Sequence, residues 1–207
     1  MAPKIVDREE KKREIVMAAM EVFSEKGVAN TKMIDIARAA GIGKGTIYEY
    51  FKNKDDIFIN LFELHFTEIG NAAAEVMGRY DDPAEILQQF VEITVSFLIN
   101  EDHNFAEIML DIWAEGIREH NEEINRVFNL DAVYSQYRDV IIQILQDGVD
   151  KGTFCSMDTT FTASLFIGAL DGILLQWLMR KDLFDSATLT DNFMKIFING
   201  IKKEVVK

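Results

Sequence analysis

The sequence is poor in the residues that build disulfides, metal sites and membrane spans. Its one cysteine, Cys155, excludes an intrachain disulfide and fits a reducing cytoplasm. The three histidines are scattered, with no pair four residues apart and no cysteine cluster, so no metal site is expected. The apolar run around residues 173–175 is soon broken by Gln176, and no apolar run approaches the roughly 20 residues of a membrane helix. The amino terminus lacks the apolar core of a signal peptide.

Proline is also scarce, and no strand-like alternation persists along the chain. Both features predict an all-helical fold of about nine helices. Gly27 suits the end of the first helix, whereas Thr31, Asp82 and Asp158 suit helix starts. Beyond a helix-turn-helix segment at residues 33–54, the helices are expected at about residues 8–26, 54–77, 83–99, 104–118, 122–150, 158–181 and 186–205.

Residues 33–54 contain two short helical patterns joined by a turn at Gly41. The second pattern, residues 44–51, buries Ile47 and Phe51 and leaves a polar, aromatic edge exposed. Small residues at the helix crossing, glycine at the turn and an exposed second helix are what a helix-turn-helix needs to enter a DNA major groove. The spacing alone fits an ordinary helical hairpin with solvated charges equally well.

A longer pattern is more specific. It resembles the amino-terminal domain of the tetracycline-repressor (TetR) family of bacterial transcriptional regulators, without gaps from about residue 10 to about residue 58. The resemblance rests on Arg13, Ile15, Ala18, Ala19, Phe23, Gly27, Ile36, Ala37, Ala40, Gly41, Ile42, Lys44, Gly45, Thr46, Ile47, Tyr48, Tyr50, Phe51 and Lys54. It implies a helix-turn-helix DNA-binding domain at residues 1–56, followed by a helical ligand-binding and dimerisation domain at residues 57–207.

Helix-turn-helix proteins read bases from the amino-terminal part of the second helix, where Lys44 can donate to guanine. The hydroxyls of Thr46 and Tyr48 can reach phosphate, although Tyr48 could instead pack against the first helix. Two residues depart from the family: Gly43 removes a common serine cap, and Glu49 puts a negative charge on the DNA face. The expected DNA-binding residues are Thr31, Lys32, Lys44, Gly45, Thr46, Tyr48, Tyr50 and Lys54. The resemblance implies that Thr31, Lys32, Tyr50 and Lys54 clamp the phosphate backbone of the DNA.

The net charge of −13 is unevenly distributed. Residues 1–56 carry 11 of the 22 basic and 10 of the 35 acidic side chains, so residues 57–207 carry 11 basic and 25 acidic ones. A protein that coats nucleic acid generally is basic throughout. Here the acidic body should repel DNA and confine contact to one local patch, which favours specific binding.

The carboxyl-terminal two-thirds has wide apolar stripes rich in aromatic residues and methionine. Each such residue alone is most simply explained as ordinary core, but together they suit a lipophilic pocket with a few polar contacts. Thr94, Trp113, Tyr134 and Tyr137 are the candidates for those polar contacts. The full set expected to bind a small lipophilic effector is Phe90, Thr94, Phe97, Met109, Trp113, Tyr134, Tyr137 and Phe166.

The last two long helices have more apolar surface than one core would absorb. The segment from Asp171 to Gln176 is similar to the family's eighth helix, which packs against a partner subunit, and Gly168 and Gly172 would permit close approach. Two amphipathic helices that cover only their own domain are the alternative. The residues expected at a homodimer interface are Ile167, Leu170, Leu174, Trp177, Phe193 and Phe197.

These observations predict a cytoplasmic, homodimeric regulator that binds double-stranded operator DNA, with no membrane partner. The resemblance implies a repressor that binds a palindromic operator and is released by its effector. No nucleophile–base pair or phosphate-binding loop can be placed, and carboxylates that could form acid–base pairs, such as Asp111, Glu115, Glu122 and Glu123, are more simply explained as solvated charges. Neither catalysis nor a cofactor is therefore expected. The alternative is a helical lipid-binding or carrier protein whose hairpin is only structural.

Overall fold

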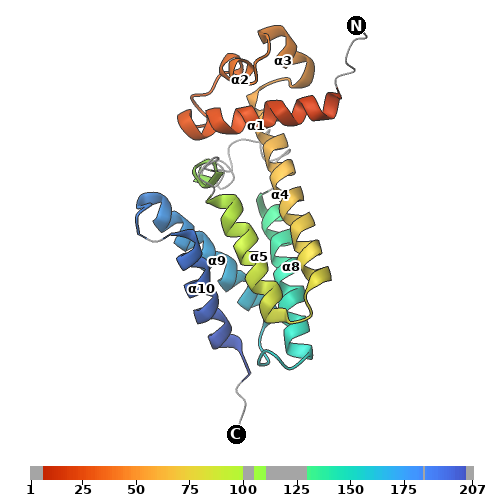
Figure 1. Ribbon diagram of the computed structural model, residues 1–207, viewed down its shortest axis with the longest axis vertical. Coiled ribbons are helices and arrows are strands. Elements are labelled where there is room, and N and C mark those ends of the chain that lie inside the picture. The colour runs from red at the N-terminus through yellow and green to blue at the C-terminus, as the bar shows by residue number, and fades with distance from the viewer. Residues whose placement is uncertain (1–6, 100–104, 111–129, 184, 204–207) are drawn as a thin grey trace. The chain divides into compact units, whose positions relative to one another are not determined.

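The computed structural model describes residues 7–99, 105–110, 130–183 and 185–203. Within these ranges the regular elements are α-helices, as predicted, apart from an isolated bridge between Phe154 and Lys202 (Figure 1). The chain divides into two compact units. The first comprises the residues up to Thr67 with residues 105–110, and the second comprises Glu68–Ile99 and the described residues from Leu130 onward. The division falls inside α4 (Lys54–Arg79), and the domain boundary expected at residue 56 stays a prediction.

The first unit begins with α1 (Arg8–Lys26), α2 (Met33–Ala39) and α3 (Lys44–Tyr50), as Figure 1 shows. The Asp7 carboxylate accepts a hydrogen bond from the Glu9 amide and starts α1. Gly27 ends α1 at a φ of 73°, and Gly41 turns the chain between α2 and α3 at a φ of 65°. Both glycines therefore take a backbone conformation that other residues rarely adopt.

Apolar side chains from α1, α3 and the first turns of α4 form the core of this unit. Phe23 meets Phe58 edge to face at 5.8 Å between ring centroids, and Phe58 meets Phe62 at 5.0 Å. Phe62 also contacts Phe105 at 5.5 Å, so the helical residues 105–110 pack on α4. Edge-to-face pairs of this kind hold aromatic rings in defined positions. These ring contacts fix α1 and residues 105–110 to the start of α4.

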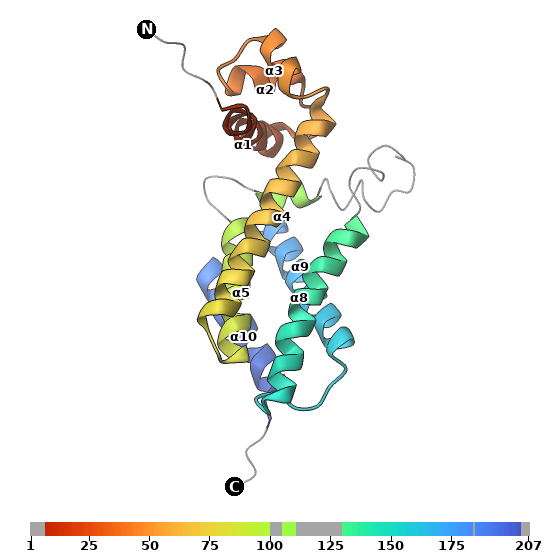
Figure 2. The ribbon, with the colours of Figure 1, turned by 90° about the vertical axis from the view of Figure 1, so that its right-hand side faces the viewer.

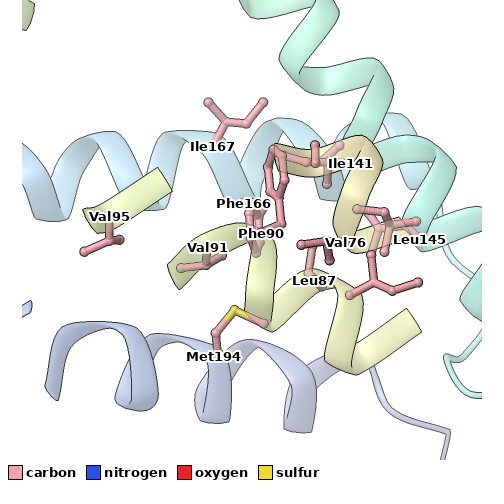
Figure 3. Packing of buried hydrophobic residues seen from close by; sticks show 14 of the residues in the cluster. Val76, Leu87, Phe90, Val91, Val95, Ile141, Leu145, Phe166, Ile167 and Met194 are labelled. Carbon is pink, nitrogen blue, oxygen red and sulfur yellow. The ribbon is translucent and has the colours of Figure 1, made fainter. Parts of the chain in front are cut away.

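The second unit is a bundle of α5 (Pro83–Leu98), α8 (Leu130–Asp150), α9 (Thr159–Met179) and α10 (Ser186–Ile201) around the last turns of α4. α5 packs against α8 and α10, and α8 packs against α9 (Figure 2). Figure 3 shows the centre of the core, where side chains from all these helices meet. Its members include Val76, Leu87, Phe90, Val91, Ile141, Leu145, Phe166, Ile167 and Met194.

The α8–α9 connection closes one end of this bundle. A Cβ atom built on Gly148 would lie 2.0 Å from the ring of Phe154, so only glycine leaves room for this buried phenylalanine. The Cys155 amide donates to the Ile201 carbonyl at 2.8 Å, which ties the end of α10 to the same connection. The Lys151 ammonium reaches the Asp81 carbonyl at 2.8 Å. The connection therefore joins the ends of α4, α8 and α10.

Most of the expected helix boundaries agree with the structure. Asp82 and Asp158 cap α5 and α9 as predicted, by accepting from the amides of Ala84 and Phe161. The expectation that Thr31 caps α2 is wrong. Lys32 is the residue immediately before α2, in the capping position. The Thr31 hydroxyl instead donates to the carbonyl of Gly27, four residues earlier, at 2.8 Å.

α9 bears on the expectation that the chain has no membrane-spanning segment, which stays a prediction. This 21-residue helix has the length and mean hydropathy of such a segment. Gln176 interrupts the apolar run at residues 173–175, but Asp171 is the one charged residue of α9, so the average over the helix stays apolar. Only 28% of an 18-residue apolar stretch of α9 is buried inside the chain. A helix that covers an apolar interface meets the same criteria, so the observation is weak support for a membrane span.

Candidate DNA-binding and effector sites

α3 exposes the edge that was expected to contact DNA. Ile47 and Phe51 point into the core, whereas Lys44, Gly45 and Glu49 are exposed and Thr46 is half-buried. Tyr48 keeps 49% of its surface exposed, which favours the DNA-facing alternative over packing against α1. Within the described ranges, the Lys44 ammonium has no hydrogen bond or ion pair, so it is available to a ligand. Gly43 starts α3 with no side-chain cap, as its departure from the family predicted.

The end of α3 is held by a residue that sequence reasoning missed. The Arg8 guanidinium donates to the Glu49 carbonyl at 3.0 Å and lies over the Tyr50 ring, 5.9 Å from its centroid. This contact joins the first residue of α1 to the last turn of α3 and brings a further cation to the DNA-facing edge. Cation–π contacts with arginine are worth about 0.5–1 kcal/mol at exposed sites. No local sequence pattern marks the pair, because its members lie 41 residues apart.

The other expected DNA-binding residues lie at or near the turn between α1 and α2. Lys32 is exposed at the start of α2, where its amide donates to the Asp35 carboxylate at 3.2 Å. The side chain of Thr31 is buried, with its hydroxyl engaged by Gly27. The Lys54 ammonium donates to the carbonyls of Val28 and Ala29 rather than projecting freely outward.

In the second unit, the structure brings together two of the polar residues expected to orient an effector. The Tyr137 hydroxyl donates to the Thr94 hydroxyl at 3.0 Å, and Thr94 donates in turn to the Phe90 carbonyl at 2.9 Å. Burial raises the pKa of Tyr137, so its hydroxyl stays protonated at neutral pH. The ring of Tyr137 also contacts Phe90 at 5.1 Å between centroids.

The third polar residue, Tyr134, pairs with an unexpected partner. Its hydroxyl donates to the Asp171 carboxylate at 2.8 Å. Burial raises the pKa of Asp171 from 3.8 to about 6, although the Tyr134 hydrogen bond opposes the rise. The available signal was that Asp171 is the only charged residue in an otherwise apolar helix. Such a carboxylate costs free energy unless it is partnered.

The remaining effector candidates are distributed between the units. Phe90, Phe97 and Phe166 belong to the core of the second unit, whereas Met109 is buried in the first unit. Trp113 lies outside the described residues. A cavity of about 20 Å³ adjoins the Thr94 side chain. It has room for about one water molecule. Its lining is Thr94, Val95, Leu98, Ile99, Leu170, Leu174 and Leu189.

The residues expected at a dimer interface mostly face the chain's own core. Ile167, Leu174 and Trp177 are buried within the single chain. Phe193 and Phe197 contact Phe166 at 5.2 and 4.7 Å between ring centroids. Leu170 packs against the same core. These contacts fit the alternative in which the two helices cover their own domain.

No group of three or more histidine, cysteine, aspartate or glutamate residues in the described part of the chain could hold a metal ion. His65 lies on α4 against Phe105, with 3.7 Å between ring centroids. Burial lowers its pKa to about 4, so the imidazole is neutral at physiological pH.

Comparisons with known proteins agree with this reading. The model of bacterial regulatory proteins of the tetR family matches residues 15–61, and the model of the YsiA-like protein C-terminal region matches residues 62–200. The fatty acid metabolism regulator protein of Bacillus subtilis (strain 168) is 28% identical over 190 residues, which cover 91% of this chain and 94% of the relative.

Solved structures show the same fold. The fatty acid degradation regulator FadR from Bacillus halodurans superimposes with a TM-score of 0.75 at 26% identity, over 92% of this chain and 95% of that one. FadR from Bacillus subtilis in complex with stearoyl-CoA has a TM-score of 0.75 at 25% identity, over 91% and 98% of the two chains. With its exposed helix-turn-helix edge and its two matching models, this chain belongs to the TetR family of bacterial transcriptional regulators.

Proposed function

We propose that this regulator binds a palindromic operator as a homodimer, represses transcription in the cytoplasm, and is released by a lipophilic effector. The observation that carries the proposal is the exposed edge of α3, where Lys44 is free to donate to a base. Membership of this family argues against the alternative of a carrier protein whose helical hairpin is only structural. We also infer that the chain acts by binding rather than by catalysis.

Substituting Lys44 tests the DNA contact. We expect Lys44→Ala to lower operator affinity by about 1–3 kcal/mol and to relax the preference at one base pair of each half-site. Fluorescence anisotropy with the operator and with scrambled DNA measures both effects. Lys202→Ala is the matched control, because it removes an exposed cation from the other unit. Parental discrimination in Lys44→Ala would place base recognition on other residues.

An exposed apolar stripe on α9 is the surface that we assign to dimerisation. Phe161, Leu165, Leu175 and Met179 are large and exposed, and together with Gly168 and Gly172 they recur every three or four residues along one side of α9. Gly168 and Gly172 lie between them, with open space where a Cβ would be. Ile196 adds an exposed apolar side chain on α10. Contiguous apolar surface of this kind marks an interface.

The small residues in the stripe favour another helix as its partner. Ridges and grooves on two helices interlock most closely where one helix offers glycine. The same stripe on a second copy presents the same residues, so a two-fold axis would pair α9 with its symmetry mate. The dimer residues assigned from sequence therefore stay a prediction, and the structure favours the opposite side of the same helix.

We propose that the effector is a long-chain acyl thioester, the class to which the stearoyl-CoA bound by the B. subtilis FadR belongs. The aromatic core around Phe90 and Phe166 offers the apolar surroundings that an acyl chain needs. Its cavity of about 20 Å³ is too small for such a chain. The effector would therefore have to bind an expanded arrangement of the bundle, and it would release DNA if that arrangement binds the operator less well.

Removing one hydroxyl tests this site without creating a large cavity. We expect Tyr137→Phe to weaken stearoyl-CoA binding about 2- to 10-fold, because the Tyr137 hydroxyl, once released from Thr94 in the expanded bundle, could no longer donate to the ligand. Operator affinity without ligand should stay near the parental value. Isothermal titration and operator-release assays measure the two quantities, with Tyr80→Phe as the control in the same unit. If Tyr137→Phe binds stearoyl-CoA as the parent does, the polar group of the ligand lies elsewhere; if the parent does not bind it, the ligand class is wrong.

A further inference from the structure

The first residue of α4 is bonded to the turn that precedes α2. The Lys54 ammonium lies 2.7 Å from the Val28 carbonyl oxygen and 2.9 Å from the Ala29 carbonyl oxygen. Both carbonyls belong to the turn after Gly27, the residue that ends α1, and the Val28 carbonyl also accepts from the Thr31 amide at 3.3 Å. A half-buried cation therefore closes a turn to which it is not adjacent in sequence.

Other bonds make this turn a defined structure. The Asn30 side-chain amide donates to the Lys26 carbonyl at 3.1 Å, and the Thr31 hydroxyl donates to Gly27. Lys26 also forms an ion pair with Asp35, at 3.3 Å. The first two bonds join the turn to the end of α1, and the ion pair joins α1 to α2. Lys54 joins the same turn to α4, so it fixes the position of the turn relative to α4.

The residue placed by this turn is Lys32. It is exposed at the start of α2, whereas Thr31 is buried with its only hydroxyl proton already donated. Lys54 has likewise committed two of its three N–H groups to main-chain carbonyls. To bind a phosphate fully, Lys54 would have to leave both carbonyls. The charge that can reach DNA from this turn without breaking a bond belongs to Lys32.

We propose that Lys54 is a positioning residue for operator binding, which holds the α1–α2 turn so that Lys32 meets a DNA phosphate. The proposal rests on the DNA-binding function proposed above and changes the role expected from sequence, in which Lys54 itself clamps the backbone. It also assigns the buried Thr31 to the turn rather than to DNA. A direct phosphate contact by Lys54 is the competing outcome.

The first test uses the free protein, so it does not depend on any operator. Lys54→Met removes both donors and the charge while keeping an apolar stem of similar length. We expect amide hydrogen exchange to accelerate at least about tenfold at Thr31 and Asp35, whose amides donate to the Val28 and Lys32 carbonyls. The matched control is Lys52→Met, an exposed cation two residues earlier, which should leave these rates unchanged.

The second test is a double-mutant cycle on operator affinity. If Lys54 acts through Lys32, each single methionine variant weakens binding about tenfold or more, and Lys32→Met costs much less once Lys54 is gone. Two independent phosphate contacts would instead give additive losses of affinity. The slope of log affinity against log salt concentration would then become shallower by about 0.9 for each lysine removed. Lys54→Gln, which retains an amide donor, should recover part of the lost affinity and serves if the methionine variant folds poorly.

Parental exchange rates in Lys54→Met together with additive losses of affinity would overturn the proposal. The outcome is separate from failure of the DNA-binding function. In that case the parent protein would not discriminate operator from scrambled DNA, although the exchange measurement would still report whether Lys54 holds the turn.

Discussion

Replacement of Leu165 by glutamate is expected to convert the homodimer into a folded monomer and to lower operator affinity by at least about 100-fold. The Leu165 side chain is 57% exposed in the single chain, so the change leaves the fold intact. In the dimer it would place a carboxylate from each copy in an apolar, desolvated contact. Two half-sites would then no longer act together.

Sedimentation velocity and anisotropy titrations measure these two consequences. The control is Gln143→Glu, which adds the same charge to an exposed position on α8. Leu174→Glu serves as a contrast, because Leu174 is only 5% exposed and the charge would enter the chain's own core. We expect that variant to unfold rather than to dissociate. A folded, operator-competent dimer of Leu165→Glu would move the interface away from the α9 stripe.

These two leucines show why the proposed interface could not be predicted from the sequence. α9 is apolar on nearly all sides, so its helical periodicity does not distinguish the face that covers the core from the face that meets a partner. Leu174 and Leu165 differ only in which side of the helix they occupy. That side is fixed by how α8 packs on α9, a long-range contact that no local pattern records.

The helix-turn-helix was predictable because its signals are local. Gly27 and Gly41 mark turns that need a positive φ, and Ile47 and Phe51 lie four residues apart on the buried face of their segment. Each of these features is decided within a few residues. The exposed edge at Lys44 could therefore be predicted from the residue spacing alone. The resemblance to a family was needed only to assign this edge to DNA binding.

Three side-chain hydrogen bonds, two around the helix-turn-helix and one in the second unit, could not be predicted from the sequence. Arg8 reaches Glu49 across 41 residues, Lys54 reaches Val28 across 26, and Tyr134 reaches Asp171 across 37. Exposed lysines and arginines favour contact with a polyanion, so sequence reasoning assigned Lys54 to phosphate. Only the folded chain shows that the Lys54 ammonium already donates to two main-chain carbonyls.

Asp171→Asn is expected to stabilise the protein at neutral pH by about 1–3 kcal/mol. Burial raises the pKa of the Asp171 carboxyl from 3.8 to about 6, so the charged form is disfavoured in the folded state. A difference of this size corresponds to about 3 kcal/mol, from which the cost of burying an amide must be subtracted. The asparagine oxygen can still accept the Tyr134 hydrogen bond.

The sign of the effect depends on pH. Below about pH 4 the carboxyl is protonated in both folded and unfolded chains, and parent and Asp171→Asn should be about equally stable. Between about pH 4 and about pH 6, the folded parent still holds a proton that the unfolded chain has lost. The free energy of unfolding of the parent therefore falls as the pH rises through this range, and the asparagine variant should not show the loss.

Urea unfolding at a series of pH values measures the difference. Asp139→Asn, an exposed position on α8, is the control that removes a carboxylate without removing a buried charge. Tyr134→Phe should act in the opposite direction, because the lost hydrogen bond normally lowers the pKa of Asp171. A pH-independent difference between parent and Asp171→Asn would show that the carboxyl is hydrated in solution.

A buried carboxylate that lowers stability is more easily explained by a ligand than by the fold. Asp171 lies on the same helix as Leu170 and Leu174, which line the small cavity beside Thr94. If an effector enters there, Asp171 would disfavour an anionic head group and accept a neutral ester or amide. We therefore expect Asp171→Asn to bind the free fatty acid more tightly than the parent does, with stearoyl-CoA binding changed less. Titration of both variants with stearate and stearoyl-CoA decides this, and unchanged stearate affinity would confine Asp171 to an effect on stability.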